Sequence, residues 1–230
     1  LVNLEGYENR MPSELSGGQQ QRVAVARAIV LKPKVLLFDE PLSNLDAKLR
    51  RQVREDIREI QQKLGVTTIY VTHDQEEALA ISDKVIVMNN AIIAQQGSPK
   101  ELYNSPKTEF VASFIGDANV VKAEVINQNK NKYELKLAEM KIDIESTQKL
   151  ENSVSIALRP EKINISKDRE ENSINATINN ASFVGNSYQY ILNTAIGKIY
   201  VVSGDTKNVF KVGENVCLKF DEKELKLLED

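Results

Sequence analysis

Up to Gly116, apolar residues recur at helical spacing and alternate with short apolar runs. Over residues 47–64 they fall on one helical face, at positions 49, 53, 57, 60 and 64, and Gly65 supplies a stop. We expect helices at 17–31 and 47–64, a buried strand at 35–38 and a further strand at 66–72. Helices that alternate with short apolar runs are typical of a parallel α/β sheet.

Further helix starts carry recognisable capping signals. Asp74 precedes a helix through Ile81, and Glu77 suggests a capping-box-like partner for it. Ser98-Pro99 with Glu101 predicts a second start, and Ser105-Pro106 a third, in a helix that Gly116 ends. Between these helices, the runs 85–88 and 92–95 flank Asn89-Asn90 and predict a hairpin.

After Gly116 the pattern changes to strict alternation of apolar and polar residues. Strands are expected at 121–125, 133–137, 140–144, 154–158, 174–178, 188–192, 199–202 and 216–220, with a loop tip at 127–132. Many short strands at this spacing suggest a small barrel or sandwich. We therefore expect two domains, 1–116 and 117–230, and a protease-resistant piece that begins near Gly116.

Composition narrows the class of protein. There are 33 acidic and 30 basic residues, a net charge of −3, and the sequence has no basic block, so a nucleic-acid partner is not expected. The single cysteine, Cys217, lies in a predicted strand and reads as a small buried apolar residue. No apolar run approaches the roughly 20 residues needed to span a bilayer, so any membrane role is expected to come through a partner.

The chemistry-bearing motifs lie in the first part. In Leu15-Ser16-Gly17-Gly18-Gln19, two glycines at the mouth of a helix expose backbone amides that can hold phosphate oxygens. The apolar run that ends in Asp39-Glu40 can place one acid near a metal and the next near an attacking water. Ser43-Asn44-Leu45-Asp46 follows, and then Thr72-His73-Asp74 with the only histidine.

This order of motifs resembles the ATP-binding-cassette (ABC) transporter ATPases: signature, Walker B, D-loop and switch histidine. The resemblance implies an α/β fold with a partial P-loop NTPase-like sheet. A Gly-x-x-x-x-Gly-Lys-Ser/Thr loop, the Walker A motif, is absent, and the only Gly-Lys pair, Gly197-Lys198, lacks the preceding glycine. We expect the chain to be the C-terminal part of a longer subunit, and to be inactive alone.

The resemblance also implies roles for individual residues. Ser16, the Gly17 and Gly18 amides and Gln19 would meet the γ-phosphate of ATP held on the opposite subunit. Asp39 would hold Mg²⁺, Glu40 would act as general base, and His73 would sense the γ-phosphate. Asp46 would belong to a loop that crosses the dimer interface.

Several of these residues also have simpler interpretations. Asp46 is a good N-cap for the helix at 47–64, and both roles can hold together. A lone histidine such as His73 is often structural. The charges over 50–63 suggest a solvated helix face with intrahelical pairs, and no site is assigned to them. Arg159 could bind an anion or pair with a carboxylate.

The second part resembles the all-β, OB-like TOBE domain of importer ATPases, through Arg159-Pro160-Glu161 and Phe183-Val184-Gly185 before Tyr188. Tyr70 to Ala78, Gly97-Ser98-Pro99 and Phe114-Ile115-Gly116 resemble the group that serves ferric-iron, polyamine, sugar, sulfate and molybdate importers. Phe114 to Asn119 favours the ferric-iron branch.

The implied partners are a second ATPase subunit in a homodimer, membrane-spanning permease subunits and, indirectly, a solute-binding protein, at the cytoplasmic face of the cell membrane. For dimer contacts of the β domain, edge strands near 183–192 or 216–220 are the candidate surfaces. Two alternatives stay open: an isolated regulatory and dimerisation module, and a non-transport ABC ATPase of DNA repair, which would carry long coiled coils.

Overall fold

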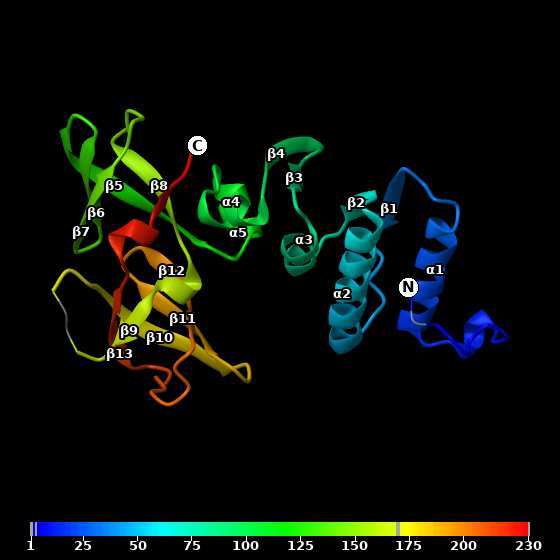
Figure 1. Cartoon of the computed structure of the whole chain (residues 1–230). Coiled ribbons are helices and arrows are strands. Elements are labelled where there is room, and N and C mark those ends of the chain that lie inside the picture. Colours follow the sequence, from blue (N-terminus) through cyan, green and yellow to red (C-terminus); the bar gives the residue numbers. More distant parts are fainter. Residues whose placement is uncertain (1, 3, 169–170, 230) are drawn as a thin grey trace. The chain divides into compact units, whose positions relative to one another are not determined.

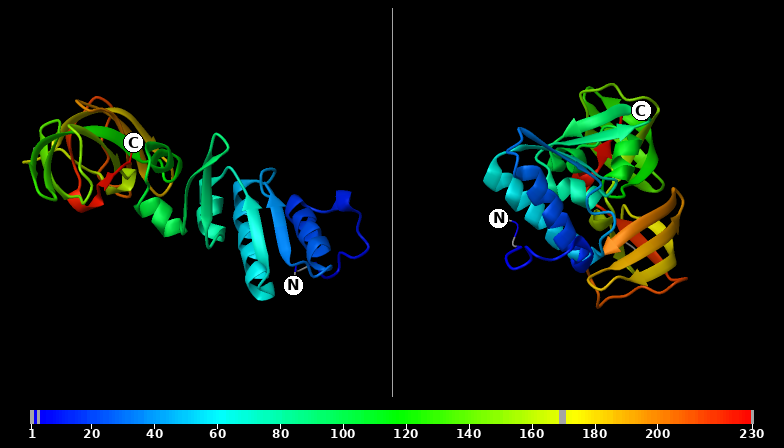
Figure 2. Two further views of the ribbon diagram at one scale, coloured as in Figure 1. Left: turned by 90° about the horizontal axis from the view of Figure 1, so that it is seen from above. Right: turned by 90° about the vertical axis from the view of Figure 1, so that its right-hand side faces the viewer.

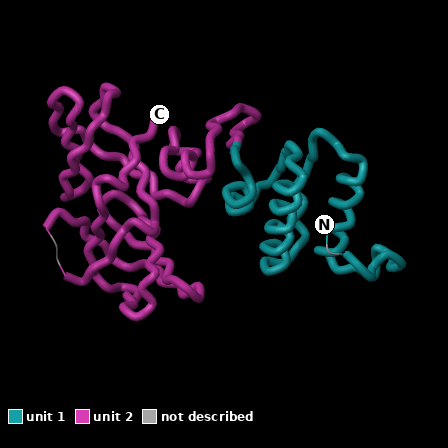
Figure 3. The backbone as a smooth tube through the Cα atoms, in the orientation of Figure 1, with its two compact units in different colours: residues 1–85 teal, residues 86–230 magenta. Residues whose placement is uncertain are grey.

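The computed structural model describes residues 2, 4–168 and 171–229 and divides into two compact units, 1–85 and 86–230 (Figures 1 and 3). Each unit is described by itself. The two short helices at 99–114 belong to unit 2, so the compact units divide earlier than the domain boundary expected at 116/117. That boundary concerns the family architecture and stays a prediction.

Unit 1 is an α/β unit built on two parallel strands. Its elements are η1 (Pro12–Glu14), α1 (Gly17–Ile29), β1 (Val35–Asp39), α2 (Ala47–Leu64), β2 (Thr67–Val71) and α3 (Gln75–Ile81). Strands β1 and β2 pair in parallel, with Val35 opposite Thr67 and Asp39 opposite Val71, and lie beside α1 and α2 (Figure 2). The α/β pattern predicted from the sequence is therefore confirmed.

The two strands are covered on one face only. Phe38 and Tyr70 pack against a core supplied mainly by the helices, and Leu36 is buried as well; the buried members of that core are Val25, Leu42, Val53, Ile57, Ile60 and Ile81. On the other face Val35, Leu37, Ile69 and Val71 are 45–74% exposed. The prediction that 35–38 is a buried strand is thus wrong for the described residues, because β1 pairs with β2 alone and has helices on one side.

The capping signals of unit 1 are mostly confirmed. Helix α2 has the predicted bounds, with Gly65 in the left-handed conformation at its C-cap (φ +60°). Helix α1 ends at Ile29, two residues early. Asp74 caps α3 by accepting from the amides of Glu76 and Glu77. Glu77 does not complete a capping box, because its carboxylate accepts hydrogen bonds from Tyr70 and Thr72 instead.

A hairpin and two short helices open unit 2. Strands β3 (Val85–Asn89) and β4 (Ile92–Gly97) pair across Asn90 and Ala91, which both have positive φ, so the turn lies one residue later than predicted. Ser98 and Glu101 form the predicted capping box of α4 (Pro99–Asn104). Helix α5 (Glu109–Phe114) begins from Thr108, whose hydroxyl accepts from the Val111 amide, and not from Ser105 as predicted.

The rest of unit 2 is two five-stranded sheets and two 3₁₀ turns, η2 (Pro160–Lys162) and η3 (Glu222–Glu224). One sheet has the order β14-β8-β5-β6-β7, with bounds Lys226–Leu227, Ser153–Leu158, Asn119–Asn129, Lys132–Leu137 and Met140–Glu145. The other has the order β12-β11-β10-β13-β9, with bounds Gly197–Ser203, Tyr188–Thr194, Ile174–Phe183, Asn215–Lys219 and Asn164–Ser166. Neighbouring strands in both sheets pair in antiparallel fashion over the described residues.

Both sheets bury their alternate positions in one shared core, so the predicted all-β unit is confirmed as two packed sheets. Its largest fully buried side chains include Tyr190, Leu135 and Ile156. Cys217 is buried and free, as predicted. Strand β5 continues to Asn129, so the loop tip at 127–132 shrinks to Lys130-Asn131. Strands β11 and β13 lie inside their sheet, so the prediction that they are edge strands is wrong.

Arg159 joins the short helices of unit 2 to its sheets. Its guanidinium is buried and donates to the backbone carbonyls of Tyr103, Ala112 and Ile115, near the C-terminal ends of α4 and α5. It also lies 4.1 Å from the centre of the Tyr103 ring. Among the described residues, the hydrogen bonds of the Arg159 guanidinium go to these three helix-end carbonyls and not to a carboxylate, so the expected carboxylate pair is replaced by a cap on two helix ends.

Candidate functional site

The acidic pair lies where β1 ends. Asp39 is the last residue of the strand, and the Glu40 amide still donates to the Val71 carbonyl at 2.9 Å, which continues the parallel ladder. Both residues are exposed. Glu40 has φ +43°, a conformation that non-glycine residues adopt rarely and that concentrates at functional sites. The strand end therefore turns Glu40 sharply towards the end of the neighbouring strand.

His73 meets Glu40 at this edge of the sheet. Nδ1 of His73 lies 3.0 Å from Oε1 of Glu40, and the two side chains are 72% and 47% exposed. The hydrogen bond to Glu40, followed by the charge of that carboxylate, raises the pKa of His73 above its ordinary value. A carboxylate and an imidazole in contact, open to solvent, are suited to orienting water and transferring protons.

The backbone around His73 is fixed by the residues on both sides of it. The hydroxyl of Thr72 donates to Oε2 of Glu77 at 2.8 Å and accepts from the Asp74 amide at 2.9 Å. Glu77 itself is 3% exposed and also accepts from the Tyr70 hydroxyl at 3.1 Å. Burial, and then Glu77, raise the pKa of that tyrosine. His73 thus projects from a loop that is anchored to the start of α3.

The Ser-Gly-Gly motif forms the start of α1. Ser16 and Gln19 make a reciprocal capping box: the Ser16 hydroxyl accepts from the Gln19 amide, and the Gln19 side chain accepts from the Ser16 amide at 2.9 Å. Ser16 and Gly17 are exposed, and the first amides of a helix have no acceptor within it. This end of α1 can therefore receive an anion.

The two glycines also have a packing role that the sequence did not reveal. A Cβ added to Gly17 would lie 2.9 Å from Cδ2 of Leu45, and one added to Gly18 would lie 2.7 Å from Cδ1 of Leu49. The start of α1 thus approaches the start of α2 closely, and Gly18 is buried there. Asp46 caps α2 by accepting from the Leu49 amide at 3.0 Å, so its simpler interpretation is confirmed.

The predicted site residues fall into two groups. Glu40 and His73 are in direct contact, with Asp39 next to Glu40. No hydrogen bond or ion pair among the described residues joins Ser16–Gln19 to that pair, although the Gln21 side chain of α1 donates to the Pro41 carbonyl at 2.6 Å. The action of Ser16 to Gln19 on a nucleotide held by another subunit stays a prediction.

Asp39 fits a magnesium ion of the kind that nucleotides carry. Mg²⁺ is usually held by one or two carboxylates together with waters and substrate phosphates, not by a cage of protein ligands. Asp39 provides one exposed carboxylate at the strand end. Over the described residues no group of three or more His, Cys, Asp or Glu side chains could hold a metal ion by itself.

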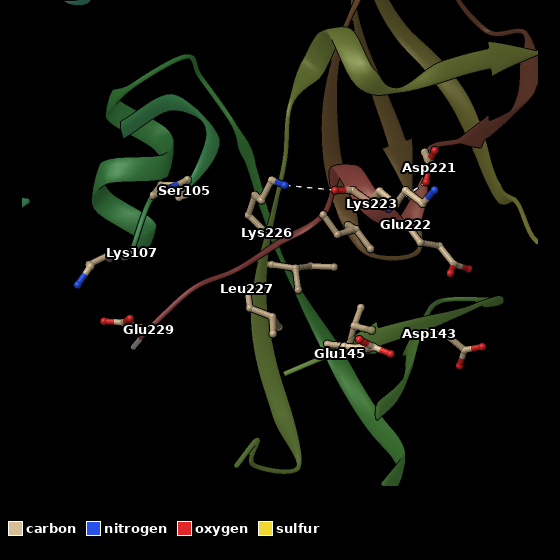
Figure 4. A pocket seen from close by; sticks show the side chains of 14 residues that line it. Ser105, Lys107, Asp143, Glu145, Asp221, Glu222, Lys223, Lys226, Leu227 and Glu229 are labelled. Atoms are coloured by element: carbon tan, nitrogen blue, oxygen red, sulfur yellow. Dashed lines mark hydrogen bonds between the residues drawn. The ribbon is translucent and has the colours of Figure 1, made fainter. Parts of the chain in front are cut away.

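Unit 2 contains a pocket of about 690 Å³ between the α4–α5 connection, β7 and the C-terminal segment (Figure 4). Its charged residues, among them Lys107, Asp143 and Glu229, are exposed or half-buried, and Lys226 donates to the Lys223 carbonyl at 3.2 Å. With no buried charged group facing it among the described residues, we assign it no ligand. In the part of the chain that the structure describes, no helix is long and apolar enough to cross a membrane.

Parallel strands that end in Asp-Glu and in a histidine, beside a helix that opens with Ser-Gly-Gly, define part of an ABC-type ATP-binding domain. Family comparison agrees: residues 1–43 match the family described as ABC transporter, and residues 156–228 match the TOBE domain. The chain belongs to the ABC transporter ATPases that carry a C-terminal TOBE domain.

Its relatives are similar along the whole chain. The protein named "Fe(3+) ions import ATP-binding protein FbpC" of Agrobacterium fabrum is 44% identical over 229 residues, covering 100% of this chain and 65% of the relative. FbpC 1 of Rhizobium meliloti is 44% identical over 228 residues, covering 99% and 64%. FbpC of Fusobacterium nucleatum is 43% identical, covering 95% and 59%. The chain thus spans less than two thirds of the length of these relatives.

A solved structure of CbiO1 from Clostridium perfringens, described as part of the ABC transporter complex cbiONQ, is 37% identical with a TM-score of 0.42. That match covers 44% of this chain and 40% of the other.

Sequence motifs do not identify every residue that shapes the site. The sequence pattern predicts Glu77 as part of a helix cap and Arg50 as part of a solvated face. The structure instead places Glu77 beneath the loop of His73, with Arg50 beside it. The burial of Glu77 depends on which side of α3 faces α2 and β2, and a single sequence carries no motif for that.

Proposed function

We propose that this chain forms part of the ATP-binding subunit of an ABC importer, in which ATP hydrolysis drives uptake of a solute. The observation that carries the proposal is the contact of Glu40 with His73, 3.0 Å apart at the ends of neighbouring parallel strands. Loops at the carboxyl ends of parallel strands are where α/β proteins build their active sites.

In this proposal Glu40 is the general base that aligns the attacking water, and His73 holds Glu40 and contacts the γ-phosphate. Phosphoryl transfer depends mainly on positioning and on neutralising charge, which suits two exposed groups that meet just beyond the ends of paired strands. The raised pKa of His73 supports this role, because a protonated imidazole donates from both ring nitrogens. One nitrogen can then bind Glu40 while the other meets a phosphate oxygen.

The other residues complete the nucleotide site. Asp39 would hold Mg²⁺ through water, and the ion would neutralise charge that develops on the phosphates. Ser16, Gln19 and the Gly17 and Gly18 amides would bind the γ-phosphate of ATP carried by the opposite subunit. Asp46 lies exposed at the start of α2, where it would contribute to the contact between the two subunits.

The proposed assembly is a homodimer of ATPase subunits bound to membrane-spanning permease subunits, peripheral at the cytoplasmic face of the cell membrane. A solute-binding protein would act on the permeases from the other side. Ferric iron is the favoured solute, because the similar relatives are named as Fe(3+) import proteins. Uptake of labelled ferric iron in cells that lack the complete subunit tests this part.

The catalytic part is tested by Glu40→Gln in the complete subunit. We expect ATP binding to persist, since ground-state phosphate contacts remain, and hydrolysis to be lost. His73→Ala should lower turnover by about 10²-fold, the range of a group that positions a proton transfer. Glu55→Gln, an exposed acid on α2, is the control. Near-normal turnover of Glu40→Gln would remove Glu40 from the role of base.

The chain alone is expected to hydrolyse no ATP, since its sequence lacks the phosphate-binding lysine loop. Turnover by residues 1–230 that Glu40→Gln abolishes would contradict this expectation.

A further inference from the structure

Arg50, in the first turns of α2, contacts two segments that are far apart in the sequence. Its Nη2 donates to the backbone carbonyl of Leu45 at 3.2 Å, and its Nη1 donates to Oδ2 of Asp74 at 3.2 Å. Leu45 directly precedes Asp46, and Asp74 directly follows His73. One guanidinium therefore connects the loop that precedes α2 with the loop that carries His73.

The same side chain also approaches the buried anchor of the His73 loop. Nε of Arg50 is buried without a hydrogen-bond acceptor and lies 3.9 Å from Oε1 of Glu77. Oε2 of Glu77 accepts from Thr72, the residue before His73. The residues on both sides of His73 are thus fixed by carboxylates that face the same guanidinium.

An arginine suits this place for a geometric reason. Its planar guanidinium directs several donors in fixed directions, whereas a lysine is a compact point charge on a flexible stem. Leu45 precedes α2, whereas Asp74 and Glu77 belong to the cap and first turn of α3, so a forked donor can bond Leu45 and Asp74 at once while its charge lies 3.9 Å from Glu77. Glu77 is 3% exposed, and a buried carboxylate of this kind needs a cation or several hydrogen bonds.

We propose that Arg50 is a positioning residue, which holds the His73 loop at a fixed distance from the segment Ser43–Asp46 and so keeps His73 against Glu40. The inference rests on the proposed function for its catalytic consequence, but the positioning itself is a property of unit 1. Any movement of Ser43–Asp46, for example on contact with another subunit, would reach His73 through Arg50.

The first test follows the His73 imidazole by NMR during a pH titration of this chain, in metal-free buffer. Glu40, Asp74 and Glu77 all raise its pKa, and Arg50 forms ion pairs with Asp74 and Glu77. Two roles of Arg50 predict opposite results for Arg50→Met. If Arg50 acted by its charge alone, its removal would raise the His73 midpoint further. If Arg50 positions the loop, contact with Glu40 loosens and the midpoint falls towards about 6.5.

We expect the midpoint to fall in Arg50→Met and to stay unchanged in Arg51→Met. Arg51 is the matched control, because it is the adjacent arginine, is exposed and carries the same charge. A midpoint that rises or does not move in Arg50→Met, with the chain still folded, would overturn the proposal.

The second test separates positioning from stability in the complete subunit. Arg50→Met should lower the turnover number for ATP by about 10- to 100-fold with little change in KM, the size of effect that a small misplacement of a reacting group produces. Arg50→Lys should recover part of the turnover, because one donor remains. Arg51→Met should retain turnover.

A double variant, Arg50→Met with Glu77→Gln, removes the buried charge that the single variant leaves without a cation. The glutamine side chain that replaces Glu77 can still accept from Thr72 and Tyr70. We expect the double variant to regain thermal stability while its turnover stays low. Recovery of both would mean that Arg50 serves only to compensate Glu77, which overturns the proposal.

The test of positioning does not depend on the test of the proposed function. If His73→Ala leaves turnover intact, the proposed function of His73 is wrong, yet the titration in this chain still decides whether Arg50 positions the loop.

Discussion

At the scale of single residues, the contact between Glu40 and His73 couples charge to geometry. The carboxylate favours the protonated imidazole, and this raises the pKa of His73. A raised pKa in the folded chain means that the contact contributes stability at pH values below the ordinary pKa of histidine. That contribution disappears as pH rises through the raised pKa. Both side chains are well exposed, so solvent keeps the effect on stability small, and titration detects it better than unfolding.

We therefore expect Glu40→Gln to lower the His73 midpoint in this chain, since the amide keeps a hydrogen-bonding oxygen but loses the charge. NMR titration of the single histidine measures it without assignment of other signals. Glu55→Gln, on the exposed face of α2, should leave the midpoint unchanged. An unchanged midpoint in Glu40→Gln would show that the two side chains do not meet in solution.

For single residues, the sequence motifs correctly identified side chains whose place follows from the strand that they come after. Asp39, Glu40 and His73 follow predicted strands, and adjacent parallel strands bring such residues to one edge. The contacts of Arg50 and Arg159 could not be predicted in this way. Their partners include backbone carbonyls, of Leu45 for the first and of Tyr103, Ala112 and Ile115 for the second. Carbonyls are present at every position, so no residue type marks those that an arginine will bind.

At the scale of elements, Asp46 has two roles that can be separated. Its carboxylate caps α2, and the proposed function also gives it a place at the subunit contact. Asp46→Ala should destabilise this chain by about 1 kcal/mol, the usual loss for an N-cap. Asp46→Asn should be close to the parent, because asparagine caps equally well. Urea unfolding measures both.

The comparison of these two variants in the complete subunit then tests the second role. If Asp46→Asn keeps stability but loses turnover, the carboxylate acts beyond the cap. Turnover that follows stability in both variants would leave Asp46 as a cap alone.

The ends of helices were predictable where residues in or next to the helix determine them. Gly65, Asp46 and the Ser98–Glu101 box set helix ends within the helix itself, and those ends were confirmed. The burial of β1 was not predictable in this way, because it depends on which elements cover each face of the strand. The apolar run at 35–38 predicts burial on both faces, and in the described residues helices cover one.

At the scale of the whole molecule, Arg159 attaches the short helices α4 and α5 to the two sheets. The change from helical to alternating pattern at Gly116 suggests that the β-rich part stands alone from there. In the structure, Ala112 of α5 packs with Ala118, Ala157 and Leu228 of the sheet region, and Arg159 binds the ends of α4 and α5. Sequence periodicity identifies elements, but it does not say against which neighbour a short helix packs.

The position of Gly116 reinforces this attachment. Its φ is +80°, and a Cβ there would overlap the ring of Tyr103 and lie 2.9 Å from Nη1 of Arg159. The Tyr103 hydroxyl in turn donates to Glu161, two residues beyond Arg159. Burial, and then this hydrogen bond, raise the pKa of Tyr103 to about 12, so the hydroxyl stays a donor throughout the physiological pH range.

We accordingly expect limited proteolysis of the chain to give a resistant piece that begins before α4, at or ahead of Ser98, and not at Gly116. Arg159→Met should remove three hydrogen bonds from a charged donor and leave helix-end carbonyls unsatisfied. This should lower the free energy of unfolding of unit 2 by roughly 3 kcal/mol. Cleavage should then reach 105–116, so that the resistant piece begins near Gly116. Lys122→Met removes an exposed cation from β5 and should change neither result. Mass spectrometry of the fragments decides: if the parent chain is already cut at Gly116 as fast as Arg159→Met, α4 and α5 are not held by Arg159.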